Sequence, residues 1–247
     1  EKDMNIFVQM WRSLFRTGVT DSPVHRVFRV VVNFILHVHP ARVSKNGIKT
    51  TYTFCLGGLN VLFFVMTALT GGLLMIYYTP DIDKAYANML DLENVIPFGT
   101  FLRNLHRWSA HAMVIAVSLH MLRVFLTASY KSPREFNWVI GVGLLLMTFL
   151  LSFTGYLLPW DQLSYWAVTV GTSMAENTPI VGTKGPFSVL GPEEDMRFIL
   201  LGGTNIDQPT LIRFYFAHCV GLPGALVGLM ALHFWRVRKA GGISRPL

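Results

Sequence analysis

Long apolar segments dominate the pattern of this 247-residue chain. Residues 50–80, 136–160 and 214–235 contain no Asp, Glu, Lys or Arg. A helix of about 20 residues crosses a hydrocarbon core of about 30 Å, so each of these segments is long enough to span a membrane. A fourth apolar segment carries arginines only near its ends. The pattern therefore predicts four transmembrane helices, at about 52–78, 103–128, 137–157 and 211–236.

The first 50 residues follow a different pattern. Residues 4–16 place apolar side chains at helical intervals with arginines between them, and residues 27–39 form a second short segment that ends before Pro40. Short amphipathic segments of this kind are typical of helices that lie on a membrane surface. We therefore predict an amphipathic region at 1–50, on the cytoplasmic side, and a transmembrane domain at 51–247. The fold class is an all-α membrane protein with a four-helix bundle.

Composition and charge support this assignment and set an orientation. With 52% hydrophobic and 14% charged residues, the chain is too apolar for an average soluble domain. Basic residues concentrate in 1–50, in the 128–137 connection and in the C-terminal tail, whereas the connections at about 79–101 and 157–212 are acidic. Because Lys and Arg mark the cytoplasmic side, both termini are predicted to lie inside. The net charge of +7 reflects this topology and does not indicate nucleic-acid binding.

Two of the predicted helices carry paired histidines. His106 and His120 are fourteen residues apart, and His218 and His233 are fifteen apart. In a regular helix these spacings give angular offsets of about 40° and 60° and axial separations of about 21 and 22 Å. Each helix thus has one histidine near each end. Ionisable residues within a span are functional candidates, and two matched pairs predict two stacked metal centres between the helices.

The other two predicted helices repeat this spacing with glycines. Gly57 and Gly71 are fourteen residues apart, as are Gly141 and Gly155. Glycine often serves close helix packing in membranes, but the match to the histidine spacing favours a cofactor. With alternating helix directions, each proposed centre has two glycines at its depth that leave room for a broad, flat ligand: Gly71 and Gly155 with His106 and His218, and Gly57 and Gly141 with His120 and His233.

Two good ligands at each depth are too few for zinc, whereas two imidazoles complete the coordination of a haem iron. Cofactor sites of this type lie in the cores of helical bundles. A six-coordinate iron has no open position for dioxygen or substrate, so the pattern favours electron transfer. Four arginines near the histidines are candidates to pair with haem propionates, although arginines near helix ends also extend to the headgroups: Arg103, Arg107, Arg123 and Arg213.

Two alternatives stay open at this point. The chain could be a two-haem membrane anchor of a dehydrogenase or hydrogenase, which exchanges electrons with quinone at one site. It could also be a four-helix transporter or channel in which the histidines carry protons. The second alternative predicts no stoichiometric haem, so a haem spectrum separates it from the others.

Several longer segments resemble the cytochrome b/b6 family, and its b6 branch in particular. They cover most of residues 51–175 and 210–247 and read CLGGLN, LTGG, LHRWSAH, HMLRVFLT, KSPREFNWVIGV, TGYLLPWDQLSYWAV and VRKAGGISRPL. The fifteen-residue histidine spacing and the Asp161 of PWDQ are also similar to b6. The family's second half, with its PEWY quinol-site motif, does not occur in this sequence. The resemblance therefore implies a separate subunit that supplies the remaining helices.

The resemblance implies a b-type cytochrome subunit of a quinol:cytochrome c (or equivalent acceptor) oxidoreductase, not catalytic alone. It implies a low-potential haem b on the outer side held by His106 and His218, and a higher-potential haem b on the inner side held by His120 and His233. Quinol would give one electron to a Rieske iron–sulfur protein and the other to the outer haem, and a quinone would be reduced near Arg238 and Lys239. The implied outer quinol site comprises Gly155, Tyr156, Leu158, Pro159, Trp160 and Asp161.

The same resemblance implies a third haem. Its surroundings alone make Cys55 a small packing residue, but in the CLGG context the resemblance implies a haem c attached by one thioether bond that faces the inner quinone site. Cys219 has no such context and is predicted to pack. The long N-terminal region and the extra sequence at 174–208 point to a bacterial complex in the cytoplasmic membrane. The family resemblance further implies a dimeric complex that includes a c-type cytochrome.

Overall fold

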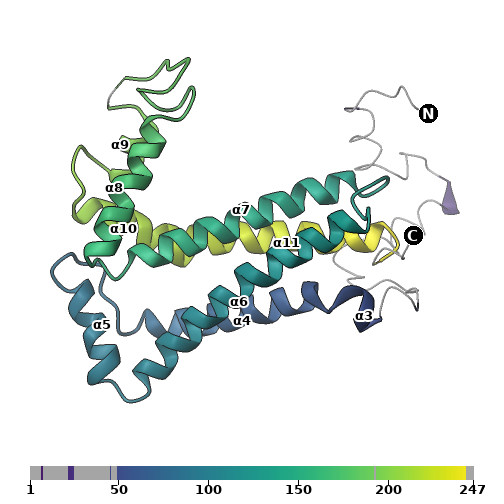
Figure 1. The fold of residues 1–247 in the computed structure, drawn as a ribbon, viewed down its shortest axis with the longest axis horizontal. Helices are drawn as coiled ribbons and strands as arrows, with labels where there is room; N and C mark the ends of the chain where they lie inside the picture. The colour runs from purple at the N-terminus through teal and green to yellow at the C-terminus, as the bar shows by residue number, and fades with distance from the viewer. Residues whose placement is uncertain (1–6, 8–21, 25–44, 46–48, 192, 243–247) are drawn as a thin grey trace. The chain divides into compact units, whose positions relative to one another are not determined.

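The structure is a computed structural model that describes residues 7, 22–24, 45, 49–191 and 193–242. Every regular element in this part of the chain is helical, which confirms the predicted all-α class. Four helices are long and apolar enough to cross a membrane (Figure 1): α4 (Leu56–Leu74), α6 (Gly99–Leu126), α7 (Glu135–Leu157) and the continuous run Gln208–Lys239. The surface helices predicted at 27–39 and, apart from Phe7, at 4–16 lie outside the described residues.

Two of the four long helices begin at residues other than those predicted, for local reasons. A short helix, α3 (Thr50–Thr53), precedes α4, and Phe54 and Cys55 between them have φ angles of 50° and 53°. Left-handed backbone interrupts a helix, so α4 begins only at Leu56. The last run begins earlier than predicted because Asp207 caps it in a capping box and Pro209 occupies its first turn.

Three shorter helices lie in the regions that the sequence presents as connections. They are α5 (Ala85–Asn94), α8 (Gln162–Glu176) and α9 (Met196–Leu201). Asp161 caps α8 by accepting a hydrogen bond from the Ser164 amide, and Asp195 caps α9 by accepting one from the Phe198 amide. The acidic residues of these connections therefore include two helix caps.

The chain divides into two compact units, and each takes part of all four long helices. The first unit draws on Glu1–Val61, Met113–Met147 and Ala225–Leu247, and the second on Leu62–Ala112 and Thr148–Gly224. The last run of helix is itself divided into α10 (Gln208–Phe216), a π-helix η1 (Ala217–Gly221) and α11 (Leu222–Lys239). The division falls just after η1, so His218 belongs to the second unit and His233 to the first.

The second unit has an apolar core at the ends of its long helices. One cluster joins Leu157, Val168, Leu201 and Phe214, so that α8 and α9 pack with α7 and α10 (Figure 1). A second cluster joins Tyr78, Ala85 and Leu211, and Trp160 packs against both clusters. The Thr210 hydroxyl donates a hydrogen bond of 2.8 Å to the Leu201 carbonyl, which fixes the end of α9 on the start of α10.

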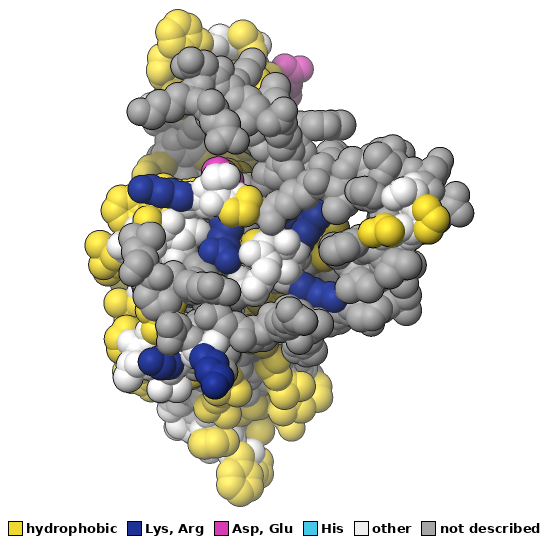
Figure 2. All heavy atoms as spheres, turned by 90° about the vertical axis from the view of Figure 1, so that its right-hand side faces the viewer, with side chains coloured by type: hydrophobic (Ala, Val, Ile, Leu, Met, Phe, Trp, Pro, Cys, Tyr) yellow, Lys and Arg dark blue, Asp and Glu magenta, His cyan; other side chains and the backbone are white. Residues whose placement is uncertain are grey.

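The two units differ in charge. Among the described residues of the first unit, Glu135 is the one acidic residue, beside eight basic ones, namely Lys45, Lys49, Arg123, Lys131, Arg134, Arg236, Arg238 and Lys239. Figure 2 shows several Lys and Arg side chains on one face of the molecule. The second unit has ten described acidic residues and six basic ones. This segregation agrees with the sequence pattern from which the orientation was predicted.

Candidate functional site: two histidine pairs

The second unit brings His106 and His218 together. His106 lies on α6 and His218 lies in η1, and their ring centroids are 6.2 Å apart with an angle of 74° between the ring planes. We refer to this pair as the 106/218 site. It joins two residues that are more than a hundred positions apart in the sequence.

Two glycines lie against the rings of the 106/218 site. A methyl group built on Gly71 would lie 3.1 Å from Cε1 of His106, and one built on Gly155 would lie 2.5 Å from Cε1 of His218. A methyl group on the neighbouring Gly72 would meet no atom within 4 Å. The glycines that face the histidines are therefore the two that the sequence spacing selects.

Two threonines contact the same histidines at the Nδ1 atoms of their rings. These threonines were not predicted from the sequence. The Thr70 hydroxyl lies 2.9 Å from Nδ1 of His106, and the Thr154 hydroxyl lies 3.2 Å from Nδ1 of His218. Both threonines are buried. Each directly precedes a facing glycine, in the segments LTGG and FTGY, and this position was the signal that could have revealed them.

The first unit contains the corresponding pair, His120 on α6 and His233 on α11. Their ring centroids are 6.4 Å apart and the ring planes make an angle of 73°, close to the values of the first pair. In this 120/233 site, methyl groups built on Gly57 and Gly141 would lie 3.8 and 3.9 Å from the Cε1 atoms of His120 and His233. Again the second glycine of the doublet, Gly58, faces open space.

The π-helix η1 explains how a fifteen-residue spacing serves the same purpose as a fourteen-residue one. A π-bulge accommodates one extra residue within an otherwise α-helical run. Residues after the bulge, His233 among them, then face the directions that they would have if the spacing from His218 were fourteen. We therefore expect the offset between His218 and His233 to approach the about 40° of a fourteen-residue spacing in a regular helix. The prediction of 60° assumed a regular helix, and this run has a π-helix at Ala217–Gly221.

Both pairs fit a haem iron. Iron bound through the Nε2 atoms of two opposed imidazoles, at about 2 Å from each, holds the ring centroids about 6 Å apart. In the described part of the chain no group of three or more His, Cys, Asp or Glu side chains gathers as a metal site on its own. The remaining iron ligands would have to come from the cofactor, as a porphyrin supplies them. The facing glycines provide the space that such a flat ring needs.

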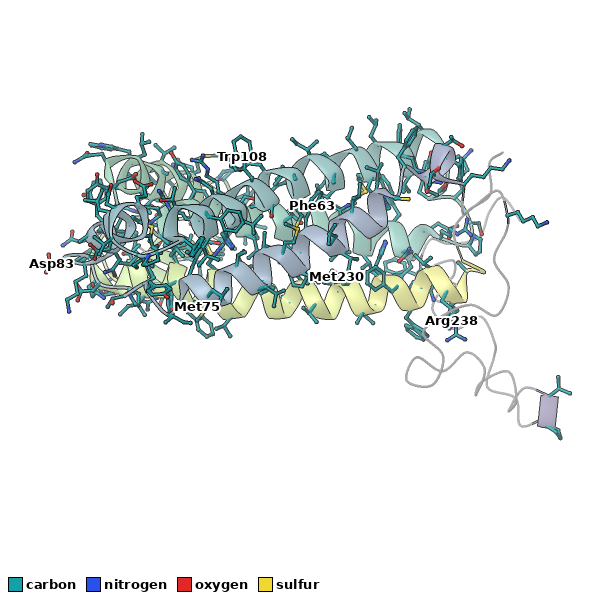
Figure 3. All side chains as sticks on the ribbon, turned by 90° about the horizontal axis from the view of Figure 1, so that it is seen from below. Phe63, Met75, Asp83, Trp108, Met230 and Arg238 are labelled. Carbon is teal, nitrogen blue, oxygen red and sulfur yellow. The ribbon has the colours of Figure 1, made fainter. Side chains whose placement is uncertain are left out.

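The four candidate propionate partners lie in different surroundings. Arg103 forms an ion pair with Glu93 of α5, and the side chain of Arg213 lies against the backbone of Gly202. Arg107 lies 5.6 Å from the centroid of the Trp108 ring, which is exposed on α6 (Figure 3). Of these four arginines, Arg123 is the one with buried guanidinium nitrogens, Nε and Nη2, that have no hydrogen bond within the described residues, and its guanidinium lies 4.3 Å from the Tyr52 ring centroid.

The PWDQ segment has a clear structural role. The Asp161 carboxylate accepts hydrogen bonds from the amide and the hydroxyl of Ser164, both at 2.8 Å. The Tyr78 hydroxyl donates a hydrogen bond of 2.6 Å to the Leu158 carbonyl. Burial raises the pKa of this phenol well above its usual value, and the nearby Cys219 and Tyr215 raise it further. Trp160 is half-buried and packs against both apolar clusters, whereas Tyr156 is exposed and Pro159 is half-buried. These contacts hold the turn that carries the predicted quinol-site residues.

Residues predicted near an inner quinone lie at the end of α11. Arg238 is labelled there in Figure 3, and the Lys239 ammonium lies 5.1 Å from the Trp235 ring centroid. Arg134, just before α7, donates hydrogen bonds to the carbonyls of Ala240 and Gly242, and burial lowers the pKa of its guanidinium. The start of α7 and the end of α11 are therefore tied together within the first unit.

The two cysteines differ in accessibility. Cys55 is exposed and lies in the left-handed break before α4, two residues from Gly57. Cys219 lies inside η1, next to His218, and is half-buried. The thiol predicted to hold a haem is thus the accessible one.

Four apolar helices that carry two half-buried histidine pairs, each faced by two glycines, are the arrangement expected of a membrane cytochrome of the b type. The family model described as "Cytochrome b/b6/petB" matches residues 41–241. The chain belongs to the cytochrome b/b6 family, and it is accordingly a multi-pass membrane protein of a family that carries b-type haem.

Individual relatives agree with this assignment. The cytochrome b6 of Heliobacterium modesticaldum is 40% identical over 194 residues, which cover 78% of this chain and 85% of that protein. The menaquinol:cytochrome c reductase cytochrome b subunit of Bacillus subtilis is 40% identical over 212 residues, 85% of this chain and 89% of that protein. A solved chain of a hyperthermophilic respiratory Complex III is 30% identical with a TM-score of 0.71 and covers 92% of this chain. This chain spans 55% of the length of that solved chain.

Proposed function

We propose that this protein is the b-type cytochrome subunit of a quinol:cytochrome c (or equivalent acceptor) oxidoreductase and is not catalytic alone. The observation that carries the proposal is the repeated site, two histidine pairs with nearly equal geometry in the two units. The relatives named above include subunits of such complexes. Bound haem would supply one-electron carriage between a quinol oxidised on one side of the membrane and a quinone reduced on the other.

The chain's own residues suit electron transfer better than oxygen or substrate chemistry. Two histidines at each site would complete the coordination of a haem iron, which would leave neither dioxygen nor substrate a coordination position. His106 and His218 would hold one haem b, and His120 and His233 the other. The facing glycines admit the ring, and Arg123 offers buried N–H groups to a propionate at the 120/233 site. The guanidinium of Arg103 is engaged with Glu93, so it is a weaker candidate for this role.

The charge distribution supports an orientation. The positive-inside rule supports an orientation in which the basic first unit faces the cytoplasm and both ends of the chain lie inside. The 106/218 site is then the outer site and the 120/233 site the inner one. In this orientation a quinol would be oxidised near Tyr156, Pro159, Trp160 and Asp161, and a quinone reduced near Arg238 and Lys239. The location that follows is a bacterial cytoplasmic membrane.

The related proteins support a split arrangement. The match covers 85% of the length of the cytochrome b6 of Heliobacterium modesticaldum, whereas this chain spans 55% of the length of the related Complex III chain. A separate subunit would supply the remaining helices and complete the outer quinol site. A Rieske iron–sulfur protein and a c-type cytochrome would receive the electrons that leave on the outer side, and the whole complex would be dimeric.

The exposed Cys55 supports a third cofactor in the first unit. Its position two residues from Gly57 lies next to the 120/233 site, and the left-handed break at Phe54 and Cys55 ends α3 before this thiol. A haem c bound there by one thioether bond would add a carrier on the side of the proposed inner quinone.

The test is a haem and redox assay of the complex purified through this subunit. We expect a pyridine-haemochrome spectrum with two b haems per chain, and b-band reduction when a short-chain menaquinol is added. A preparation with no stoichiometric haem would refute the proposal and favour a transporter. Menaquinol reduction of the b haems without any electron delivery to a c-type cytochrome or similar acceptor would favour the anchor of a dehydrogenase or hydrogenase.

A further inference from the structure

The hydrogen bonds behind the four histidines differ between the two units. In the 106/218 site both Nδ1 atoms meet a threonine hydroxyl, at 2.9 Å from Thr70 and 3.2 Å from Thr154. In the 120/233 site the equivalent positions before the facing glycines are Leu56 and Ile140, which have no hydroxyl. Among the described residues, the buried Nδ1 of His233 contacts no hydroxyl, and the backbone of Asn137 is the hydrogen-bonding group near this ring.

The direction of the threonine hydrogen bonds follows from the other bonds that the hydroxyls make. The Thr70 hydroxyl donates to the Met66 carbonyl at 2.6 Å, and the Thr154 hydroxyl donates to the Leu150 carbonyl at 2.9 Å. A hydroxyl has one proton, so each oxygen can only accept from the histidine. His106 and His218 therefore carry their proton on Nδ1, which leaves Nε2 as the free ligand. His218 also directs Nδ1 at the Leu151 carbonyl, 3.1 Å away.

We propose that Thr70 and Thr154 lower the reduction potential of haem at the 106/218 site relative to the 120/233 site. An acceptor on Nδ1–H makes the imidazole a stronger donor to iron, and a stronger donor stabilises the ferric state more than the ferrous state. The two threonines act through the histidines, so they are positioning residues. This inference rests on the proposed function, because it requires that both sites hold haem.

The resulting difference has a functional direction. An electron that enters at the 106/218 site passes to a site that accepts it more readily, so transfer toward the 120/233 site is favoured. The basic residues of the first unit act in the same direction, because positive charge near a site stabilises its reduced state. The experiment must therefore separate the hydroxyls from the charges.

Potentiometric titration of the b bands in the intact complex provides the test, with Thr70→Val, Thr154→Val and the double variant. We expect each single variant to shift the ferric-to-ferrous equilibrium of the 106/218 haem about tenfold toward the ferrous form, which corresponds to about 59 mV upward for one electron. The double variant should shift it further. The potential of the 120/233 haem should not change, and Thr70→Ser and Thr154→Ser should restore the original value.

Matched controls remove other hydroxyls from the same helices. Among the described residues, the hydroxyl of Thr67 on α4 donates to the Phe63 and Phe64 carbonyls, and that of Ser152 on α7 donates to the Thr148 carbonyl. Thr67→Val and Ser152→Ala should leave both potentials unchanged. Unchanged potentials in Thr70→Val and Thr154→Val, with two b haems still bound, would overturn the inference and leave the proposed function intact.

The converse variant decides the question if the threonine variants lose haem. Ile140→Thr places a hydroxyl before Gly141, the position that a threonine occupies before each facing glycine of the 106/218 site. We expect the potential of the 120/233 haem to fall by a similar factor while the other haem is unaffected. A rise or no change with full haem content would overturn the inference. Absence of haem from the unmodified complex would instead refute the proposed function.

Discussion

The histidine pairs of the two units have the same geometry but different surroundings. Ring centroids are 6.2 Å apart in the 106/218 site and 6.4 Å apart in the 120/233 site, with nearly equal angles between the planes. The 106/218 site adds two threonine hydroxyls and lies in an acidic unit, whereas the 120/233 site lacks them and lies in a basic one. The comparison shows that ligand geometry can be repeated while the electrostatic surroundings set each site apart.

The sites also differ in how closely the glycines approach. Methyl groups on Gly71 and Gly155 would lie 3.1 and 2.5 Å from the facing imidazoles, but those on Gly57 and Gly141 would lie 3.8 and 3.9 Å away. The 106/218 site is therefore the tighter of the two, and it should tolerate change less well.

The largest expected effect comes from removing a ligand. His106→Ala or His218→Ala should remove one b haem per chain, and His120→Ala or His233→Ala should remove the other, because a single imidazole leaves the iron one ligand short. Pyridine-haemochrome quantification with low-temperature spectra distinguishes the two losses. His111→Ala is the matched control, since this exposed α6 histidine directs Nδ1 at the Arg107 carbonyl of its own helix. Variants that each keep two normal b haems would show that the pairing is wrong.

Glycine substitution should separate the tight site from the looser one. We expect Gly155→Ala to lose most of the 106/218 haem, since overpacking costs about 1–3 kcal/mol even where neighbours can shift. Gly141→Ala should retain more of the 120/233 haem, because its methyl group meets only ordinary van der Waals contacts. Gly72→Ala and Gly58→Ala, whose methyl groups meet nothing within 4 Å, should keep both haems. Equal haem loss in Gly141→Ala and Gly155→Ala would contradict the inference that the 106/218 site is packed more tightly than the 120/233 site.

The two units also differ in whether their cysteine is expected to carry a covalently attached haem. After SDS denaturation and acid–acetone extraction, b haem leaves the polypeptide but a thioether-linked haem stays. We expect peroxidase-active staining of this band, lost in Cys55→Ser and kept in Cys219→Ser, because Cys55 is exposed and Cys219 is half-buried inside η1. A band without stain would leave a protein with two b haems only. The histidine pairs do not depend on this result.

Much of the transmembrane plan was predictable, because long uncharged segments and fourteen-residue spacings appear directly in the sequence. The four spans and the glycines that face each histidine follow from those patterns alone. The short helices α5, α8 and α9 were not predicted, because segment length and apolarity identify only transmembrane helices. The π-helix was signalled only by a fifteen-residue spacing, and the threonines only by their place before a glycine. Contacts between α4 and α6, or α7 and η1, depend on tertiary packing that a single sequence does not display.

The smallest expected effect concerns Asp161, a helix cap in the second unit that has no counterpart at the 120/233 site. Asp161→Ala removes the acceptor for the Ser164 amide and should cost about 1 kcal/mol of stability, with loosening of α8. Asp161→Asn keeps a good capping residue but removes the charge. If this residue serves only as a cap, the asparagine variant should match the unmodified complex in both thermal stability and quinol:cytochrome c reductase rate. We expect it instead to keep the stability and lose part of the rate, because a proposed quinol site needs a proton acceptor near the oxidised hydroxyl. Asp207→Asn, which alters the cap of α10 outside the PWDQ segment, controls for loss of negative charge in the same unit.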